Sequence, residues 1–313
     1  MAAGNQMDAR DTGKATPSAV TSRGEQNPPF LRSKATNITA GGFAADVRHK
    51  ARRVMDGTVG KGNRMILILA TVILMTVAMG VYLVSVGVYM GGSLLFGSVL
   101  WLDIATYALM GVLALTVVLP LAASVFRLAC LMTCSVATGA NGLSEGVSAV
   151  SALSQIVYPF TSRAAYRRCM AVGMETLGWI LLWAGLPAAG FGVLASLFDQ
   201  MANRGVLAGL CDLMTALSLF VCVGIGVLLL LLSGRRAGFG YLVFVHEDIS
   251  LREVNRRFKG LGRSFVRPFV LRLSLTGWVA LSIVAVLVPF VVHTVPYGLC
   301  CGAVYGYMLH DEC

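Results

Sequence analysis

Charged residues are scarce in this chain. Only 13% of its 313 residues are Asp, Glu, Lys or Arg, whereas 57% are hydrophobic. A soluble domain of ordinary composition has about a quarter charged residues, and the apolar residues here fall in long uninterrupted blocks. A large soluble core is therefore excluded, and the composition predicts a polytopic membrane protein.

Motifs of metal sites and of enzymes are missing too. None of the eight cysteines forms a C-x-x-C pair, and Cys130 and Cys134, which share a helix face, are interpreted as small apolar core side chains. No Ser-His-Asp order, pair of carboxylates or H-E-x-x-H pattern occurs. We therefore expect no cofactor, no metal and no enzymatic activity.

Basic residues are nearly confined to one side of the predicted membrane. Eleven Lys and Arg precede the first apolar block, four lie at or between the second and third, nine lie from Arg235 to Arg272, and only Arg204 falls between the third and fourth. The positive-inside rule then places the N-terminus in the cytoplasm of a multi-pass cell-membrane protein. The same rule explains the net charge of +10, so we expect no nucleic-acid partner.

The apolar blocks predict an all-α bundle with six membrane-spanning helices and both termini inside. The last block, 269–309, reaches about 60 Å as a helix, roughly twice the hydrocarbon thickness, so we divide it into two spans that meet near Pro289. One span followed by a surface helix is the alternative. The expected spans are about 65–90, 104–131, 170–197, 206–232, 269–287 and 289–309.

The chain divides into a tail and one helical domain. Residues 1–42 are rich in Gly, Ala, Ser, Thr, Asn and Pro, with only isolated apolar residues. Such a segment cannot bury enough surface to offset the cost of ordering, so we expect a disordered cytoplasmic tail. Residues 43–313 form the integral membrane domain.

Besides the connection 136–168, whose apolar residues recur at helical spacing and whose end is basic, two cytoplasmic stretches have the pattern of basic amphipathic helices. The first begins at Phe43 and is suited to an anionic inner leaflet, with a solvated charged flank of the first span as the alternative. In the second, Ser250-x-x-Glu253 resembles a capping box. The basic residues expected at the membrane surface are Arg48, Lys50, Arg52, Arg53, Arg256, Arg257 and Lys259.

Glu175 is the most informative polar residue within the predicted spans. It falls in the first turns of the third span, where a carboxylate needs a partner or water, and Arg127 and Arg272 lie at similar depths on neighbouring spans. We hypothesise a pair between Glu175 and one of these arginines that fixes helix packing. The alternative is a proton- or ion-coupled site. His293 could then act as a proton relay, although a structural histidine is the simpler interpretation.

The segment LSLTGW, residues 273–278, begins the fifth predicted span. Its small residues Ser274 and Gly277 predict close helix packing. Trp278 is expected to be an interfacial anchor. We interpret the segment, together with Pro296 and Tyr297, as a packing signature in preference to a substrate site.

The C-terminal part of the chain resembles a known family. Its motifs are an acidic turn at Asp248, a Ser-x-x-Glu helix from Ser250 to Glu253 that ends in Lys259-Gly260, the LSLTGW signature, Pro296-Tyr297, and an aromatic-acidic end from Tyr305 to Glu312. These are similar to the motifs of uncharacterised bacterial membrane proteins in domain-of-unknown-function family 975. The resemblance covers most of residues 43–313, although the family's Ile-Pro-Gly-Ile turn is absent from 198–207. It implies a helical membrane fold and no known activity.

Two functions are consistent with these patterns. The first is a non-enzymatic membrane-organising or accessory protein that binds lipids or other membrane proteins, because basic amphipathic helices are present without a convergent polar site. The second is a small-molecule or ion transporter, which would need a polar cavity around Glu175 and His293. The expected partners are the anionic inner leaflet and other membrane proteins.

Overall fold

Helices make up all the regular structure of the described chain. The computed structural model describes residues 39–56, 62–96, 100–137, 154–205, 208–232, 237–246, 249–260, 266–284 and 289–311, and no strand occurs in these ranges. The predicted all-α class is therefore confirmed. Most of the predicted disordered tail, residues 1–38, lies outside the described residues.

Four stretches of helix are long and apolar enough to cross a membrane. The first is α2 (Asn63–Phe96). The second is continuous from α3 (Leu100–Leu113) through a π-helical turn, η2 (Ala114–Val118), into α4 (Leu119–Ala137). The others are α6 (Arg163–Asn203) and α7 (Ala208–Leu232). The predicted multi-pass character agrees with this finding, and the first four predicted spans correspond to these helices.

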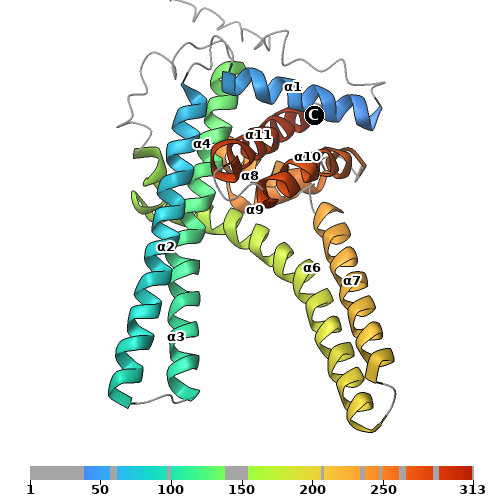
Figure 1. Ribbon diagram of the computed structural model, residues 1–313. Helices are drawn as coiled ribbons and strands as arrows, with labels where there is room; N and C mark the ends of the chain where they lie inside the picture. The colour runs from blue at the N-terminus through green and yellow to red at the C-terminus, as the bar shows by residue number, and fades with distance from the viewer. Residues whose placement is uncertain are drawn as a thin grey trace, which may run out of the picture.

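The four long stretches form two hairpins that extend from one end of the molecule and diverge (Figure 1). One pairs α2 with α3, and the other pairs α6 with α7. Large apolar side chains are exposed along both, for example Leu94 and Phe220, which are 87% and 78% exposed. Outward-facing apolar side chains of this kind are what a lipid environment requires.

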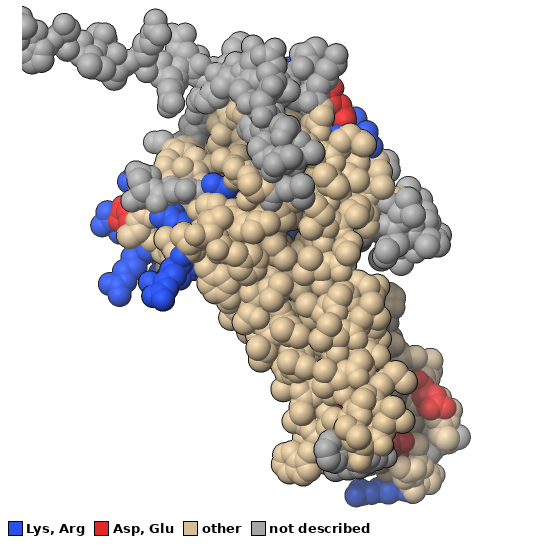
Figure 2. Space-filling model, turned by 90° about the vertical axis from the view of Figure 1, so that its left-hand side faces the viewer, with Lys and Arg blue, Asp and Glu red and all other residues tan. Residues whose placement is uncertain are grey.

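Charged residues bracket an uncharged length on both hairpins. Asp103 and Arg127 are 24 positions apart on the α3–α4 stretch, and Glu175 and Asp199 are also 24 apart on α6, with no charged residue between either pair. At 1.5 Å per residue this is about 36 Å, slightly more than the hydrocarbon core of about 30 Å. On one face, Figure 2 shows the corresponding uncharged surface between the basic end and the few charges at the tips.

The remaining helices gather at the end from which the hairpins leave (Figure 1). They are α1 (Ala40–Asp56), α8 (Ala237–Val245), α9 (Leu251–Gly260), α10 (Val266–Val284) and α11 (Val295–Asp311), the last preceded by the π-helical turn η5 (Phe290–Thr294). We call these helices the head. Because α10 and α11 pack on α1 and lie across the hairpins' direction, the prediction that residues 269–309 form two further spans is not confirmed.

The apolar face of α1 is buried in protein. Phe43, Val47 and Val54 are at most 1% exposed, and α1 packs on α10 and α11. The same face was expected to be free to lie on a leaflet; tertiary packing covers it instead.

Lys50 was predicted to lie at the membrane surface, and this prediction is wrong. Its side chain is buried, with Nζ 2.8 Å from the carboxylate of Asp46 and 3.9 Å from Sδ of Met308. The ion pair with Asp46, one helical turn earlier, partly compensates for taking the ammonium group out of water. Lys50 therefore belongs to the junction of α1 and α11 and not to an exposed basic surface.

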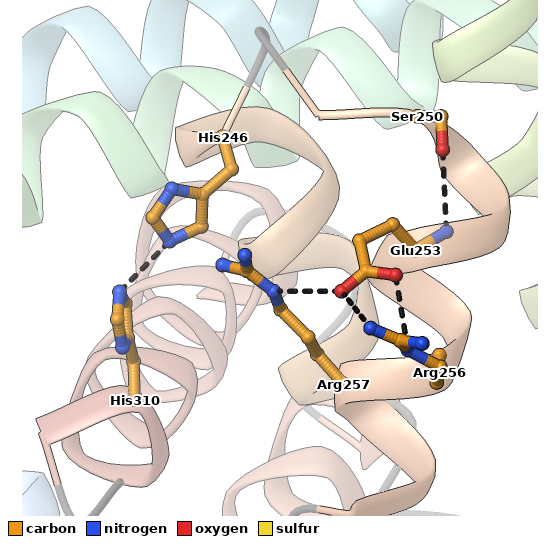
Figure 3. A network of polar contacts seen from close by, with 6 residues as sticks. All are labelled: His246, Ser250, Glu253, Arg256, Arg257 and His310. Atoms are coloured by element: carbon orange, nitrogen blue, oxygen red, sulfur yellow. Dashed lines mark hydrogen bonds and ion pairs between the residues drawn. The ribbon is translucent and has the colours of Figure 1, made fainter.

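The helix predicted after the capping motif is α9. The Oγ of Ser250 accepts a hydrogen bond from the backbone N–H of Glu253 at 3.4 Å, which is the N-cap half of a capping box. The Glu253 carboxylate pairs with Arg256 and Arg257 (Figure 3). Val254 and Phe258 on the apolar face are buried against α8, so this face too is covered by protein.

Candidate functional site

A cavity of about 500 Å³ lies where the two hairpins join the head. Its volume falls in the range of small-molecule and cofactor sites, about 300–1,000 Å³. Helices α4, α6, α10 and α11 form the walls, with one residue from α8. The main apolar and small wall residues are Leu119, Ala122, Ala123, Phe126, Val172, Gly173, Ile180, Gly240, Pro268, Leu271, Leu275, Gly298, Leu299 and Gly302.

Glycines shape the cavity in two different ways. A Cβ at Gly173 would lie 2.6 Å from Leu119, and one at Gly240 would lie 2.8 Å from Phe126, so these glycines allow the walls to approach closely. At Gly298 of α11, by contrast, a Cβ would have no atom within 4 Å. Gly298 therefore lines the cavity without a close neighbour, and a Cβ there would meet open space.

Arg272 is the only charged residue among the described residues that line this cavity. It lies on α10 and is half-buried. The other lining residues with polar side-chain groups are Thr176, Trp179, Cys301 and Tyr305. The Thr176 hydroxyl donates to the Val172 carbonyl at 2.9 Å within its own helix. The site is thus a largely apolar chamber whose described lining includes one cationic side chain.

The cavity extends from the charged boundary of the hairpins into their uncharged length. Leu119 is eight positions from Arg127 on the uncharged side, which is about 12 Å along the helix. On α6, Ile180 is five positions beyond Glu175, or about 8 Å. If the uncharged length lies within a bilayer, the cavity walls at Leu119 and Ile180 would be at the level of lipid acyl chains, and the head would be at the level of lipid headgroups.

The structure assigns different surroundings to Arg127 and Glu175. The guanidinium of Arg127 donates to Oε1 of Gln155 and stacks over the ring of Tyr158, 3.7 Å from its centroid. The Glu175 carboxylate accepts from the indole N–H of Trp179 at 3.1 Å, and Trp179 in turn lines the cavity. The hypothesis that Glu175 pairs with Arg127 or Arg272 stays a prediction.

His293 lies in η5 with its ring 5.9 Å from that of Tyr297 in an edge-to-face arrangement. Neither His293 nor Glu175 is among the described residues that line the cavity. The structure therefore does not bring the two predicted transport residues together in this chamber.

The residues of the predicted packing signature differ in their surroundings, and the signature stays a prediction. Pro296 and Tyr297 are buried in the head, and the Ser274 hydroxyl donates to the Leu271 carbonyl at 2.6 Å. At Gly277, however, a Cβ would meet no described atom within 4 Å, so close approach of a neighbouring helix does not require this glycine. The side chain of Trp278 lies outside the described residues.

Two polar features of the head could not be predicted from the sequence. The guanidinium of Arg168 donates to the carbonyls of Val243, His246 and Ile249 at 3.1–3.2 Å, where α8 ends. In addition, Nε2 of His246 lies 2.8 Å from Nε2 of His310 at the end of α11 (Figure 3). The partners are 64 to 81 residues apart in sequence, so no local pattern could have joined them.

The other predicted surface basic residues are at least partly accessible to solvent. Arg52, Arg53, Arg256, Arg257 and Lys259 are exposed, and Arg48 is half-buried with its Nε donating to the Ala44 carbonyl at 3.3 Å. All of them lie on α1 or α9, hence in the head. The basic side of the charge pattern thus coincides with the head end of the molecule.

No protein-family model matches this chain, and neither a curated protein nor a solved structure does. The resemblance to domain-of-unknown-function family 975 accordingly stays a prediction.

Proposed function

We propose that this protein is a non-enzymatic accessory protein of the cell membrane that holds a lipid in the cavity where its two hairpins join the head. The observation that carries the proposal is the chamber of about 500 Å³, whose walls are apolar apart from Arg272 and a few hydroxyl, thiol and indole groups. A lipid acyl chain is the apolar molecule that a bilayer supplies at this depth. The absence of convergent acid–base or nucleophilic groups among the described lining residues argues for binding without chemistry.

The basic residues of the head support a cytoplasmic position for this end of the molecule. We place the head and both termini in the cytoplasm, since Lys and Arg retained near helix ends set the direction of insertion. The exposed basic residues of α1 and α9 would then face the anionic inner leaflet, each worth about 1 kcal/mol near the surface. Because the apolar faces of both helices are covered by protein, this attraction would be electrostatic and would weaken with salt.

Gly298→Leu tests the lipid-binding proposal. Gly298 lines the cavity and a Cβ there meets no atom within 4 Å, so we expect a leucine side chain to take up volume that an acyl chain would otherwise use. Native mass spectrometry of gently extracted protein should show lipid retained by the wild type and lost from the variant. Gly277→Leu is the matched control, because it also enters open space but is not among the described cavity residues.

The measurement needs a check on folding. Helix content and thermal midpoint should be the same in both glycine variants. Should Gly298→Leu fail to fold, Ala122→Leu on the α4 wall repeats the test from another helix. Retention of the same lipid by folded Gly298→Leu and Gly277→Leu would contradict the proposal.

We further propose four membrane crossings, with α10 and α11 belonging to the cytoplasmic head. Pro289 then lies on the inner side, whereas with six spans it would lie on the outer side. A cysteine introduced as Pro289→Cys should not react with a membrane-impermeant thiol reagent in intact cells. Arg204→Cys, at the α6–α7 tip, should react, and Arg256→Cys in the head should not. Reaction at position 289 above the wild-type background would establish the six-span alternative.

A further inference from the structure

We infer that the cavity opens sideways into the bilayer, through a portal between α4, α6 and α10, and that its lipid enters from the leaflet next to the head and not from the cytosol. This inference rests on the proposed lipid-binding function and adds the route and the leaflet from which the ligand comes. It is drawn from the exposure of the lining residues and from the depth of the cavity.

The exposure of the α6 wall rises from the head toward the uncharged length of the hairpin. Val172 is only 7% exposed, whereas Ile180, eight residues later on the same wall, is 42% exposed. Thr176 lies between them and is also exposed. The α6 wall is therefore covered by protein near the head and uncovered further along.

Two helices of the head show the same change in exposure. On α10, Leu271 is 5% exposed, whereas Leu275, one turn later, is half-buried. On α11, Cys301 and Tyr305 are at most 2% exposed, and Gly298 at the other end of that wall is half-buried. Walls from three helices are thus buried at one end and accessible at the other, as expected for a chamber with an open side.

The open side lies where the two hairpins separate. Helices α4 and α6 are close at Gly173, where a Cβ would lie 2.6 Å from Leu119. Beyond this contact the hairpins diverge (Figure 1). We therefore assign the rim of the portal to Leu119 on α4, Trp179 and Ile180 on α6, and Leu275 on α10.

The depth of the portal selects the leaflet. Leu119 and Ile180 lie about 12 and 8 Å into the uncharged length of the hairpins. A hydrocarbon core of about 30 Å consists of two leaflets of about 15 Å each, so both residues fall within the leaflet next to the head. An acyl chain of this leaflet is already beside the portal, whereas a molecule from the cytosol would first have to pass the lipid headgroups. The geometry thus favours a membrane lipid over a soluble apolar metabolite.

Thiol labelling in inside-out membrane vesicles tests the route. Gly298→Cys places a thiol in the cavity, because a Cβ there meets no atom within 4 Å. The vesicles, whose cytoplasmic face is outward, are treated with an apolar maleimide that partitions into lipid or with a charged maleimide that stays in water. Arg256→Cys, at an exposed position of the head, is the reference for each reagent. Labelling is counted above the wild-type background.

Relative to Arg256→Cys, Gly298→Cys should react about tenfold faster with the apolar reagent than with the charged one. Adding Ile180→Trp narrows the portal and should slow the apolar reaction of Gly298→Cys about tenfold. Leu181→Trp is the matched control, because Leu181 is also exposed on α6, at 62%, but is not among the described lining residues. It should leave the rate unchanged. Should Gly298→Cys fail to fold, Ala122→Cys on the α4 wall repeats the labelling.

The outcomes distinguish this inference from the proposal on which it rests. Equal relative rates for the two reagents, or equal rates in the two tryptophan variants, would overturn the lateral portal and leave lipid binding untouched. If neither reagent labels the cavity thiol, a phospholipid with a photoactivatable group in its acyl chain decides: the absence of cross-links to cavity peptides in the same vesicles overturns the inference. If wild-type protein retains no lipid in native mass spectrometry, the proposed function itself fails, whichever route the reagents take.

Discussion

Replacing Gly306 by alanine is expected to lower the free energy of unfolding by about 3 kcal/mol, near the upper end of typical overpacking costs. A Cβ at this position of α11 would lie 2.3 Å from Cβ and 2.7 Å from Cγ of Tyr241 on α8. Tyr241 is only 1% exposed, and its hydroxyl lies 3.2 Å from Sγ of Cys134, so its side chain has little room to move. The two helices would have to separate, which would open the core of the head.

The same substitution at Gly298 is the control for this effect. Gly298 lies on the same helix, and a Cβ there meets nothing within 4 Å. Because alanine favours helix over glycine by about 0.5–1 kcal/mol, Gly298→Ala should leave stability unchanged or raise it slightly. Thermal unfolding in detergent, followed by circular dichroism, measures both. Equal midpoints for the two variants would show that α8 and α11 do not approach as closely as the structure indicates.

Arg168→Ala is expected to destabilise the head by about 3 kcal/mol. The guanidinium joins the beginning of α6 to three backbone carbonyls at and beyond the C-terminal end of α8. The last carbonyls of a helix have no partner within the helix and form the negative end of its dipole, so a cation there is favoured. Removing it leaves these acceptors dependent on water at a partly buried position.

The neighbouring arginine supplies the comparison for this prediction. Arg167 is exposed, so Arg167→Ala should change the free energy of unfolding by less than about 0.5 kcal/mol. Arg168→Lys should recover only part of the stability, because an ammonium group cannot reach several carbonyls with the geometry of a guanidinium. A thermal midpoint for Arg168→Ala as high as that of Arg167→Ala would mean that the contact contributes nothing to the fold.

The arrangement links stability to the proposed function through shared helices. Helices α8 and α11, which pack together at Gly306, also contribute Gly240 and Gly298 to the cavity. Arg168 lies four residues before Val172, which lines the cavity on α6. The contacts that hold the head together therefore also position the walls of the chamber. Variants at Gly306 and Arg168 are stability probes and are unsuited to testing the ligand.

The sequence by itself determined the helical class and the four long apolar helices, although it predicted two further spans that the structure does not confirm. Long runs without charge have only one stable form in a bilayer, the helix, because every backbone polar group must be satisfied within the segment. Local sequence signals were also sufficient to predict where α9 begins. Ser250 caps this helix by accepting from the backbone N–H of Glu253, as the spacing of the two residues predicts. The charge pattern likewise identified the basic end, which coincides with the head.

Only the tertiary structure decided which apolar faces meet protein and which remain outside. Helical periodicity shows that α1 has an apolar stripe, but whether lipid or another helix covers it depends on residues more than two hundred positions away. The length of the last apolar run predicted two spans, but length alone does not show what the run packs against. Contacts of α10 and α11 with α1, and of α11 with α8, place both helices in the head. The cavity is the strongest case. Its lining comes from five helices, and Arg272 becomes its charged residue only when those helices are assembled.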